Sequence, residues 1–277
     1  MPQMLIFGLG FTAKVLAARL RGEGWTVRAT GRDGDLDFAD RAAVESALGG
    51  ASHVLSSVSP AAASGDPVLA AYGEELGGKW LGYLSSTGVY GDTGGAWVDE
   101  AARIGLGRRT ARSEADLAWQ AAGAHVFRLP GIYGPGRSPL DRVASGVAHR
   151  IDLPEQVFSR VHVEDIASGV IAAFAAPPGE YKLADDLPVS QNAVLEEASR
   201  LLARAPPPLQ TLEQANLSPM ARGFYAENRR VANGKARRLL GWKPAYSTYR
   251  EGLRALSATI SPASASAPPA AASNVHR

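Results

Sequence analysis

The chain has 277 residues, of which 45% are hydrophobic, and a formal net charge of +2. A charge this close to zero argues against a strongly electrostatic nucleic-acid surface. The absence of an apolar run of 18 residues argues against a membrane span. Without cysteine there are no disulfides, thiolate nucleophiles or thiolate metal sites. The opening segment MPQMLIFGLG has no basic lead, so we expect no signal peptide and a cytoplasmic location.

Arginine and histidine carry little positional information in this sequence. Arginine accounts for 24 of the 29 basic residues, so a single arginine is a weaker functional signal than usual. The five histidines show no i, i+4 or His-x-His spacing, and we therefore expect no metal site.

The first 129 residues predict strands that alternate with helices. Apolar runs bounded by glycine indicate strands, and apolar stripes at helical spacing indicate helices. The strands are expected at residues 3–7, 25–30, 53–58, 79–85 and 124–129, and the helices at 11–21, 40–48, 68–76 and 110–122. Asp40 is a candidate N-cap for the second helix. This alternation predicts a parallel sheet with helices on both faces, which binds ligands beyond the carboxyl ends of its strands.

Beyond Pro130 the pattern becomes less regular. Helices are expected at residues 164–175, 189–203 and 231–240, with a short strand at 181–183. From residue 257 onward the chain is almost wholly Ser, Ala and Pro. Such a segment cannot bury enough apolar area to offset chain entropy, so 257–277 is predicted to be a disordered tail.

A dinucleotide fingerprint of the G-x-G-x-x-A form follows the first strand, at Gly8-Leu-Gly10-Phe11-Thr12-Ala13. Gly8 permits the tight turn, Gly10 lets the backbone approach a pyrophosphate, and Ala13 keeps the helix close to the strand. The helix N-terminus then faces the anion. The alternative is a turn with only a structural role.

The end of the second predicted strand bears on cofactor choice. NAD sites usually place an acid there to bind the ribose 2′-hydroxyl, whereas this chain has Gly31 and then Arg32. A guanidinium fork suits a 2′-phosphate, so we expect NADP in preference to NAD. Asp33, which follows directly, favours NAD instead. The alternative interpretation of Arg32 is an ordinary surface arginine with no role in cofactor binding.

Three further segments resemble the extended and atypical short-chain dehydrogenase/reductases, the NAD(P)-dependent epimerase/dehydratase relatives. They are residues 83–92 (YLSSTGVYGD), 128–136 (RLPGIYGPG) and 161–166 (VHVEDI), in the family's order and spacing. The resemblance covers roughly residues 3–250. It implies a Rossmann-type, doubly wound α/β fold for residues 1–256, with a nucleotide-binding core at about 1–137 and 158–184. A smaller C-terminal substrate lobe would comprise about 138–157 and 185–256.

The resemblance also assigns roles to residues at the end of the fourth strand and beyond it. Ser86, with Thr87 beside it, occupies the position of the hydroxyl that bonds the substrate's reacting oxygen. Pro130 and Gly131 would border the nicotinamide. The alternative for the two hydroxyls is that they only satisfy backbone groups at the strand end. His162, in the third segment, is more often structural than catalytic when it stands alone.

The sequence departs from the family at its Tyr-x-x-x-Lys pair. Arg108 and Arg112 stand in these places, and no tyrosine or lysine lies between Gly91 and Ala124. Because arginine stays protonated, Arg108 cannot relay a proton, although Arg112 can still contact the cofactor ribose. Tyr90 is a candidate substitute for the missing tyrosine, and Tyr133 is a second one.

The first hypothesis is an NAD(P)-dependent oxidoreductase or epimerase/dehydratase-like enzyme that acts on a small substrate through Ser86 and Thr87. A sugar-nucleotide-like molecule is one candidate for that substrate. The second is a protein that binds NADP(H) without turnover and reports redox state to a partner. A third is a structural relic without cofactor. Relatives often dimerise, so a homodimer is one expectation.

Overall fold

The computed structural model describes residues 1–61, 65–107 and 110–260. Its centre is a six-stranded sheet in which every neighbouring pair is parallel. The strands run in the order β2 (Thr26–Ala29), β1 (Gln3–Phe7), β3 (His53–Ser56), β4 (Trp80–Ser86), β6 (His125–Leu129) and β10 (Gly179–Lys182). Parallel strands need crossover connections, and helices supply them here. The predicted Rossmann-type α/β class is confirmed.

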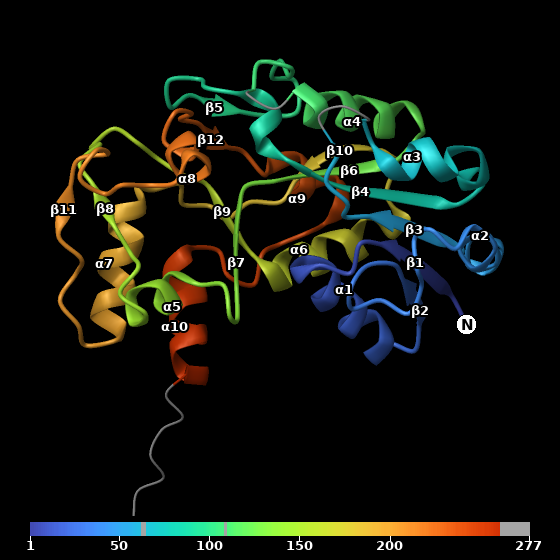
Figure 1. The fold of residues 1–277 in the computed structure, drawn as a ribbon, viewed down its shortest axis with the longest axis horizontal. Helices are drawn as coiled ribbons and strands as arrows, with labels where there is room; N and C mark the ends of the chain where they lie inside the picture. Colours follow the sequence, from blue (N-terminus) through green and yellow to red (C-terminus); the bar gives the residue numbers. More distant parts are fainter. Residues whose placement is uncertain (62–64, 108–109, 261–277) are drawn as a thin grey trace, which may run out of the picture.

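Helices cover both faces of the sheet (Figure 1). On one face lie α1 (Phe11–Gly22), α6 (Val163–Ala172) and α9 (Gly234–Leu240), whose apolar residues share a core with the sheet. On the other lie α2 (Arg41–Gly50), α3 (Pro67–Tyr72) and α4 (Thr110–Ala121). The predicted cap of α2 is present, because the Asp40 side chain accepts a hydrogen bond from the Ala43 backbone N–H. Short 3₁₀ turns follow α3 (η1, Gly73–Leu76), β4 (η2, Thr87–Tyr90) and α6 (η3, Ala173–Ala175).

Strand order reverses between β1 and β3. From β1 the chain crosses outward to β2 and then returns to the other side of β1 to form β3. The carboxyl ends of β1 and β3 therefore open into the crevice where open α/β sheets bind their ligands.

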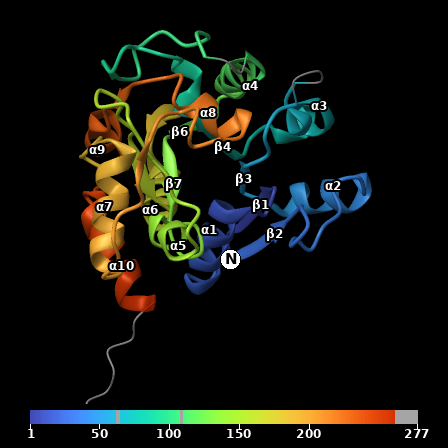
Figure 2. The ribbon, with the colours of Figure 1, turned by 60° about the vertical axis from the view of Figure 1, so that its left-hand side comes forward.

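The C-terminal part of the chain adds a lobe with a core of its own. This core is formed by α5 (Pro139–Ala144), α7 (Gln191–Leu201) and α10 (Tyr249–Ile260), which lie together in Figures 1 and 2. The lobe also holds α8 (Pro219–Phe224) and the paired strands β8 (Arg150–Ile151) and β11 (Leu209–Gln210).

Two small parallel pairs connect the lobe to the rest of the molecule. One joins β7 (Gly131–Tyr133) to β9 (Arg160–His162), and the other joins β5 (Trp97–Val98) to β12 (Arg230–Val231). The N–H of Val231 also donates to Ser159 Oγ, at 2.9 Å. Strands that are distant in the sequence, such as β5 and β12, are therefore held together by hydrogen bonds beside the central sheet.

Two predicted boundaries at the C-terminal end are wrong. The helix expected from residue 231 begins at Gly234, because Val231 pairs with β5 instead. The tail expected from residue 257 begins later, because α10 continues to Ile260 and its buried Leu256 belongs to the lobe core. The rest of the predicted tail, 261–277, lies outside the described residues.

Within the described ranges, no helix combines the length and the apolar stretch needed to cross a bilayer. The same residues contain no group of three His, Cys, Asp or Glu side chains placed to hold a metal ion.

Candidate active site

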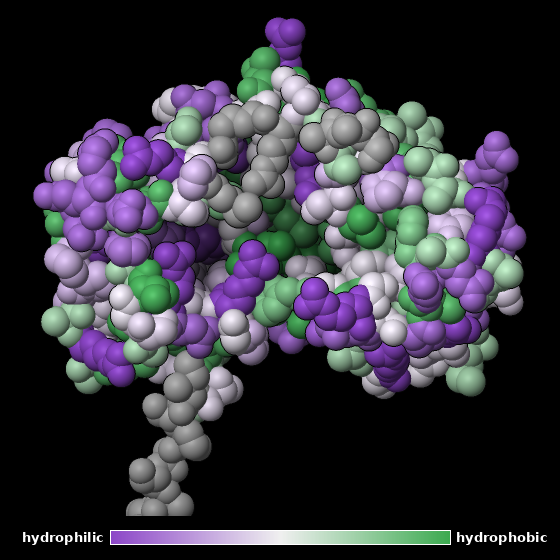
Figure 3. All heavy atoms as spheres, in the orientation of Figure 1, coloured by the Kyte–Doolittle hydropathy of each residue, from purple (hydrophilic) through white to green (hydrophobic). Residues whose placement is uncertain are grey.

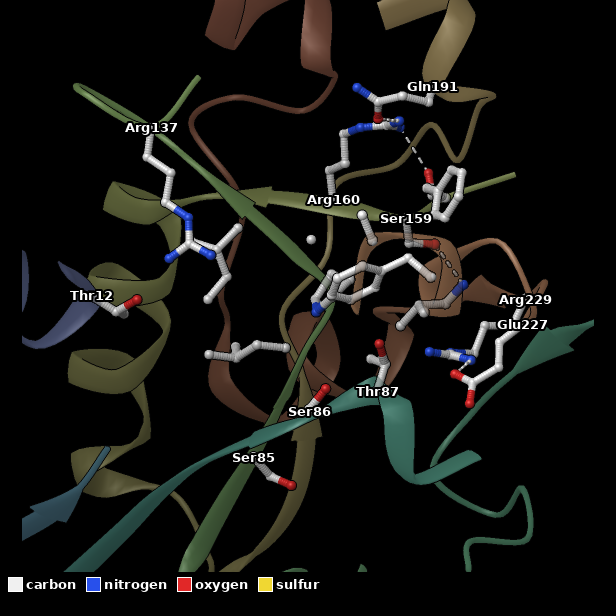
Figure 4. A pocket seen from close by; sticks show the side chains of 18 of the residues that line it. Thr12, Ser85, Ser86, Thr87, Arg137, Ser159, Arg160, Gln191, Glu227 and Arg229 are labelled. Atoms are coloured by element: carbon white, nitrogen blue, oxygen red, sulfur yellow. Dashed lines mark hydrogen bonds and ion pairs between the residues drawn. The ribbon is translucent and has the colours of Figure 1, made fainter. Parts of the chain in front are cut away.

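A pocket of about 630 Å³ lies at the carboxyl ends of the central strands, between the sheet and the lobe. Figure 3 shows a recess near the middle of this face, with apolar residues at its floor, and Figure 4 shows side chains that line the pocket. Predicted site residues in its wall are Gly10, Phe11, Thr12, Ser86, Thr87, Arg112, Pro130 and Gly131. Those outside the wall are Gly8, Ala13, Arg32 and Tyr90.

The fingerprint glycines give the pocket one open end at the start of α1. Gly8 has φ +86°, and an added Cβ would approach Ser57 Oγ to 3.1 Å. Gly10 is the N-cap of α1 and has neither a capping side chain nor an acidic residue in the turn that follows. A Cβ at Gly10 would meet nothing within 4 Å. Open space before an uncapped helix N-terminus fits the pyrophosphate of a dinucleotide.

The turn after β2 explains why no acid stands at residue 31. Gly31 has φ +111°, and a Cβ there would come within 3.1 Å of the Leu9 backbone nitrogen. Arg32 is exposed. The Asp33 carboxylate forms an ion pair with Lys14, at 2.6 Å, and this contact lowers the pKa of Asp33. The acid that argued for NAD therefore already has a cation partner.

Three consecutive hydroxyl residues close β4, and they have different roles. Ser85 donates to Asp116 Oδ2 at 2.6 Å and is committed to this buried contact. Ser86 Oγ accepts from the Gly88 N–H at 3.1 Å, which caps η2. Thr87 begins η2, and its side chain lies in the pocket with that of Ser86 (Figure 4). The strand end therefore presents two hydroxyls to a ligand.

Tyr90 lies away from this pocket. Its side chain is 1% exposed, and its hydroxyl accepts a hydrogen bond from Arg128 Nη1 at 2.8 Å. Burial raises the pKa of Tyr90. Lys182 is also buried and lies over the Tyr90 ring, with Glu100 as its ion-pair partner. The geometry places Tyr90 in an internal network and not beside the hydroxyls that it was predicted to assist.

The second member of the absent Tyr-x-x-x-Lys pair is replaced by an arginine that does reach the pocket. Arg112, on α4, donates from Nη1 to the Tyr83 hydroxyl and from Nη2 to Ser59 Oγ, both at 3.0 Å. It therefore fixes the loop after β3 against α4. Arg108, at the tyrosine position, lies outside the described residues.

The remaining predicted wall comes from the segment after β6. Pro130 and Gly131 lead into β7 and border the pocket. The Arg137 guanidinium stacks on the Phe11 ring, 5.5 Å from its centroid, at the cofactor end. Tyr133 points elsewhere: its buried hydroxyl has no hydrogen-bond partner among the described residues.

The lobe contributes charged residues that sequence reasoning largely missed. Arg229 donates from Nη1 to Gly91 O at 2.6 Å and to Glu227 Oε2 at 2.9 Å. Arg142 and Arg160 also line the pocket. No motif in the sequence marked Arg142 or Arg160.

No protein-family model matches the chain. A curated relative from Streptomyces, a 3-diazoavenalumate denitrifying reductase, is 34% identical over 140 residues. That match covers 46% of this chain and 45% of the relative, so it spans less than half the length of the curated protein.

Solved structures match over nearly the whole chain. A functionally unknown conserved protein from Silicibacter pomeroyi is 41% identical, with a TM-score of 0.83, over 94% of this chain and 99% of its own. The dTDP-glucose 4,6-dehydratase of Bacillus anthracis, solved with NAD, has a TM-score of 0.72 at 15% sequence identity. That match covers 93% of this chain and 96% of the dehydratase. A human epimerase family protein, solved with NADPH, has a TM-score of 0.73 at 15% sequence identity. That match covers 92% of this chain and 99% of the human one.

The structural similarity to the dehydratase and to the epimerase family protein indicates the same fold as the sequence motifs and the parallel sheet do. At 15% identity the enzymes with bound cofactor show the shared fold, while the Silicibacter protein is a relative over the full fold. The chain therefore has the fold of the extended short-chain dehydrogenase/reductase-like proteins, and the Silicibacter protein is its relative over nearly the full length of both chains.

Proposed function

We propose that this protein is a nicotinamide-dependent oxidoreductase that prefers NADP(H) and acts on a small organic substrate. One observation carries the proposal. A single pocket joins the open, uncapped N-terminus of α1 to the hydroxyls of Ser86 and Thr87. A dinucleotide with its pyrophosphate at Gly10 would extend toward those hydroxyls along the strand ends.

The preference for NADP rests on the residues that follow β2. Arg32 is exposed, and among the described residues it forms no ion pair that would occupy its guanidinium. Asp33 is held by Lys14, and Asp35 accepts bonds from Arg28 and from the Ala29 N–H. The side chain most available to the ribose end of a cofactor is therefore a cation, which suits a 2′-phosphate.

The chain's own residues would bind and orient the substrate. When bound, the nicotinamide supplies or accepts the hydride. The hydroxyls of Ser86 and Thr87 can donate to a substrate oxygen, and Arg112 holds Ser59 at the rim of the cofactor end. Without a tyrosine relay, a reaction that needs no strong general acid suits the site best. The name of the Streptomyces relative, a reductase, supports the reductive direction.

Nucleotide titration tests the cofactor half of the proposal. Purified protein is titrated with NADPH and NADH by calorimetry, in the wild type and in Arg32→Ala. We expect NADPH to bind more tightly than NADH, and Arg32→Ala to weaken NADPH by about tenfold, as for the loss of one charged hydrogen bond. Arg19→Ala, an exposed arginine paired with Glu23, is the matched control. Equal affinities, or an unchanged Arg32→Ala, contradict the NADP preference.

Turnover tests the catalytic half. NADPH consumption is measured across a panel of aldehydes, ketones and other electrophiles, and then in Thr87→Val and Ser86→Ala with the best substrate. We expect both variants to keep NADPH binding and to lose at least about tenfold in kcat, because their hydroxyls would bond the reacting oxygen of the substrate and not the nucleotide. NADPH binding without any consumption would favour the non-catalytic sensor instead.

A further inference from the structure

Arg160 is a buried cation in the wall of the pocket. It lies on β9, is 6% exposed, and extends toward Gln191 at the lobe side of the pocket (Figure 4). Its Nη1 donates to Phe158 O at 2.9 Å, and its Nη2 donates to Gln191 Oε1 at 3.0 Å. Its longer contacts, with the carbonyls of Val189 and Ser190, are also with neutral oxygens. The hydrogen bonds of this guanidinium hold its geometry but do not neutralise its charge.

The carboxyl that most influences Arg160 compensates this charge only in part. Asp185 acts on Arg160 electrostatically, but the two form no ion pair within 4 Å among the described residues. Burial raises the pKa of Asp185 to about 7 and so disfavours its charged form. Burial lowers the pKa of Arg160 only to about 10. Arg160 is therefore a cation in a site where a buried charge needs a partner.

A second arginine and an aromatic pair line the same pocket as Arg160. Arg142, on α5, is exposed and lines the same pocket. Burial raises the pKa of the Tyr225 hydroxyl, and the charges of Arg142 and Arg160 both counter this rise. Both cations therefore lie within electrostatic range of the Tyr225 hydroxyl. The Tyr225 ring meets Phe158 edge to face, with centroids 5.5 Å apart.

Acidic side chains are scarce around this end of the pocket. Among the described lining residues the only carboxylate is Glu227, and it is paired with Arg229. The lining arginines are Arg112, Arg137, Arg142, Arg160 and Arg229. Among the described residues that line the pocket, arginines therefore outnumber carboxylates.

We propose that Arg142 and Arg160 bind a terminal carboxylate or phosphate of the substrate, with an apolar, planar part of the same molecule packed against Phe158 and Tyr225. As the substrate, this ligand rests on the proposed function. The anion anchors one end, and the reacting atom lies toward Ser86 and Thr87 on the opposite side of the view in Figure 4. The site therefore selects small aromatic or conjugated acids over neutral molecules of the same shape.

Probe binding to the NADPH-loaded full chain tests this inference. The probes are trans-cinnamate, its neutral isostere cinnamamide, and phenyl phosphate, each titrated by calorimetry at constant ionic strength. The variants are Arg142→Ala and Arg160→Gln, the latter checked for folding by its thermal transition. Arg222→Ala is the matched control, because it removes an exposed arginine of the neighbouring helix α8 that lies outside the pocket wall.

We expect cinnamate or phenyl phosphate to bind at least about tenfold more tightly than cinnamamide, since hydrogen bonds to charged groups are worth about 1.5–3 kcal/mol. Arg142→Ala should remove most of this difference, and Arg222→Ala should leave it unchanged. The tighter of the two anions identifies the group as carboxylate or phosphate.

Three results would overturn the anion site, whatever Arg160→Gln does. Cinnamate and cinnamamide could bind equally well, or neither cinnamate nor phenyl phosphate could bind. The third result is an Arg142→Ala variant that keeps the full difference in affinity between anionic and neutral probes. NADPH affinity, measured in the same titrations, separates this outcome from failure of the proposed function. A protein that binds NADPH but does not discriminate the probes loses only the anion site. A protein that binds cinnamate but does not bind NADPH loses only the cofactor role.

Discussion

Arg128 and Asp116 form a two-bonded ion pair beneath the strand ends, with side chains that are 3% and 0% exposed. Arg128 Nη2 donates to Asp116 Oδ1 at 2.7 Å, and Nε donates to Oδ2 at 3.1 Å. Asp116 also accepts from Ser85 Oγ. One carboxylate thus ties α4, β6 and the residue before Ser86 together, and the position of the pocket hydroxyls depends on it.

Asp116→Ala is expected to lower the free energy of unfolding by about 3–5 kcal/mol, because it leaves the Arg128 charge buried and unpaired. Urea unfolding measures this loss. Glu23→Gln, which removes the partner of Arg19 in an exposed pair, should cost no more than about 1 kcal/mol. Similar losses in the two variants would show that the Arg128–Asp116 pair is not a structural anchor.

Tyr90→Phe should reduce stability but not function. The change removes the acceptor of one Arg128 hydrogen bond and should cost about 1–3 kcal/mol. NADPH affinity and the rate of NADPH consumption should stay within about twofold of the wild type, since Tyr90 does not line the pocket. A fall in kcat with unchanged NADPH affinity and a normal thermal transition would instead make Tyr90 the proton donor.

Arg112→Ala should loosen cofactor binding more than it destabilises the fold. The variant frees Ser59 and the Tyr83 hydroxyl from α4, and we expect NADPH to bind about tenfold more weakly. Arg103→Ala, an exposed arginine before α4, serves as the control. If the two variants bind NADPH equally well, Arg112 has no role in holding the cofactor end.

His162 should make stability fall between pH 6.5 and 4. It is the N-cap of α6 and accepts the Glu164 N–H through Nδ1, and burial lowers its pKa from 6.5 to about 4. In this window the unfolded chain binds the proton and the folded one does not, so acid favours unfolding by up to about 3 kcal/mol.

Urea unfolding from pH 7 to 4.5 tests this effect against His162→Asn, which keeps a capping side chain. The variant should be less stable than the wild type at pH 7, because it loses the ring contacts with Tyr133 and Tyr246. The difference should shrink as the pH falls. A constant difference across this range would mean that His162 does not titrate on unfolding.

Gly252→Ala should destabilise the lobe although alanine favours helices. A Cβ on Gly252 of α10 would collide with the Tyr133 hydroxyl, and overpacking of this kind costs about 1–3 kcal/mol. Gly49→Ala in α2, where a Cβ meets nothing within 4 Å, should be neutral or stabilising. The thermal transitions of the two variants give the comparison. A higher transition temperature for Gly252→Ala would contradict the packing of α10 on β7.

Local patterns were sufficient to predict the Rossmann core. The strand from Gln3 to Phe7 and the helix after Gly10 follow from apolar periodicity and from glycine spacing, which are properties of a few neighbouring residues. Ser86 and Thr87 were found through the resemblance of residues 83–92 to a known family, and β4 ends at Ser86 as that resemblance implied. Such features need no knowledge of distant contacts.

The residues missed at the substrate end depend on tertiary contacts. Arg160 looks like any other arginine in an arginine-rich chain, and its burial comes with contacts to residues 189–191, which are distant in the sequence. The helix assigned from residue 231 failed for the same reason, because Val231 pairs with a strand more than a hundred residues earlier. Tyr90 was favoured by its nearness to Ser86 in sequence, but η2 turns it into the interior.

The pocket is assembled from two sets of parts. Its cofactor end is made of turns of the sheet core, such as Gly10 and Ser59, whereas the end beyond Thr87 is made by the lobe and by the chain entering β9. On the proposed function, exchanging side chains at Arg142 or Tyr225 would change which substrate is recognised and would leave the dinucleotide site at Gly10 unchanged. For protein engineering, the pocket residues of the lobe can therefore be varied while the residues of the sheet core at the cofactor end are kept.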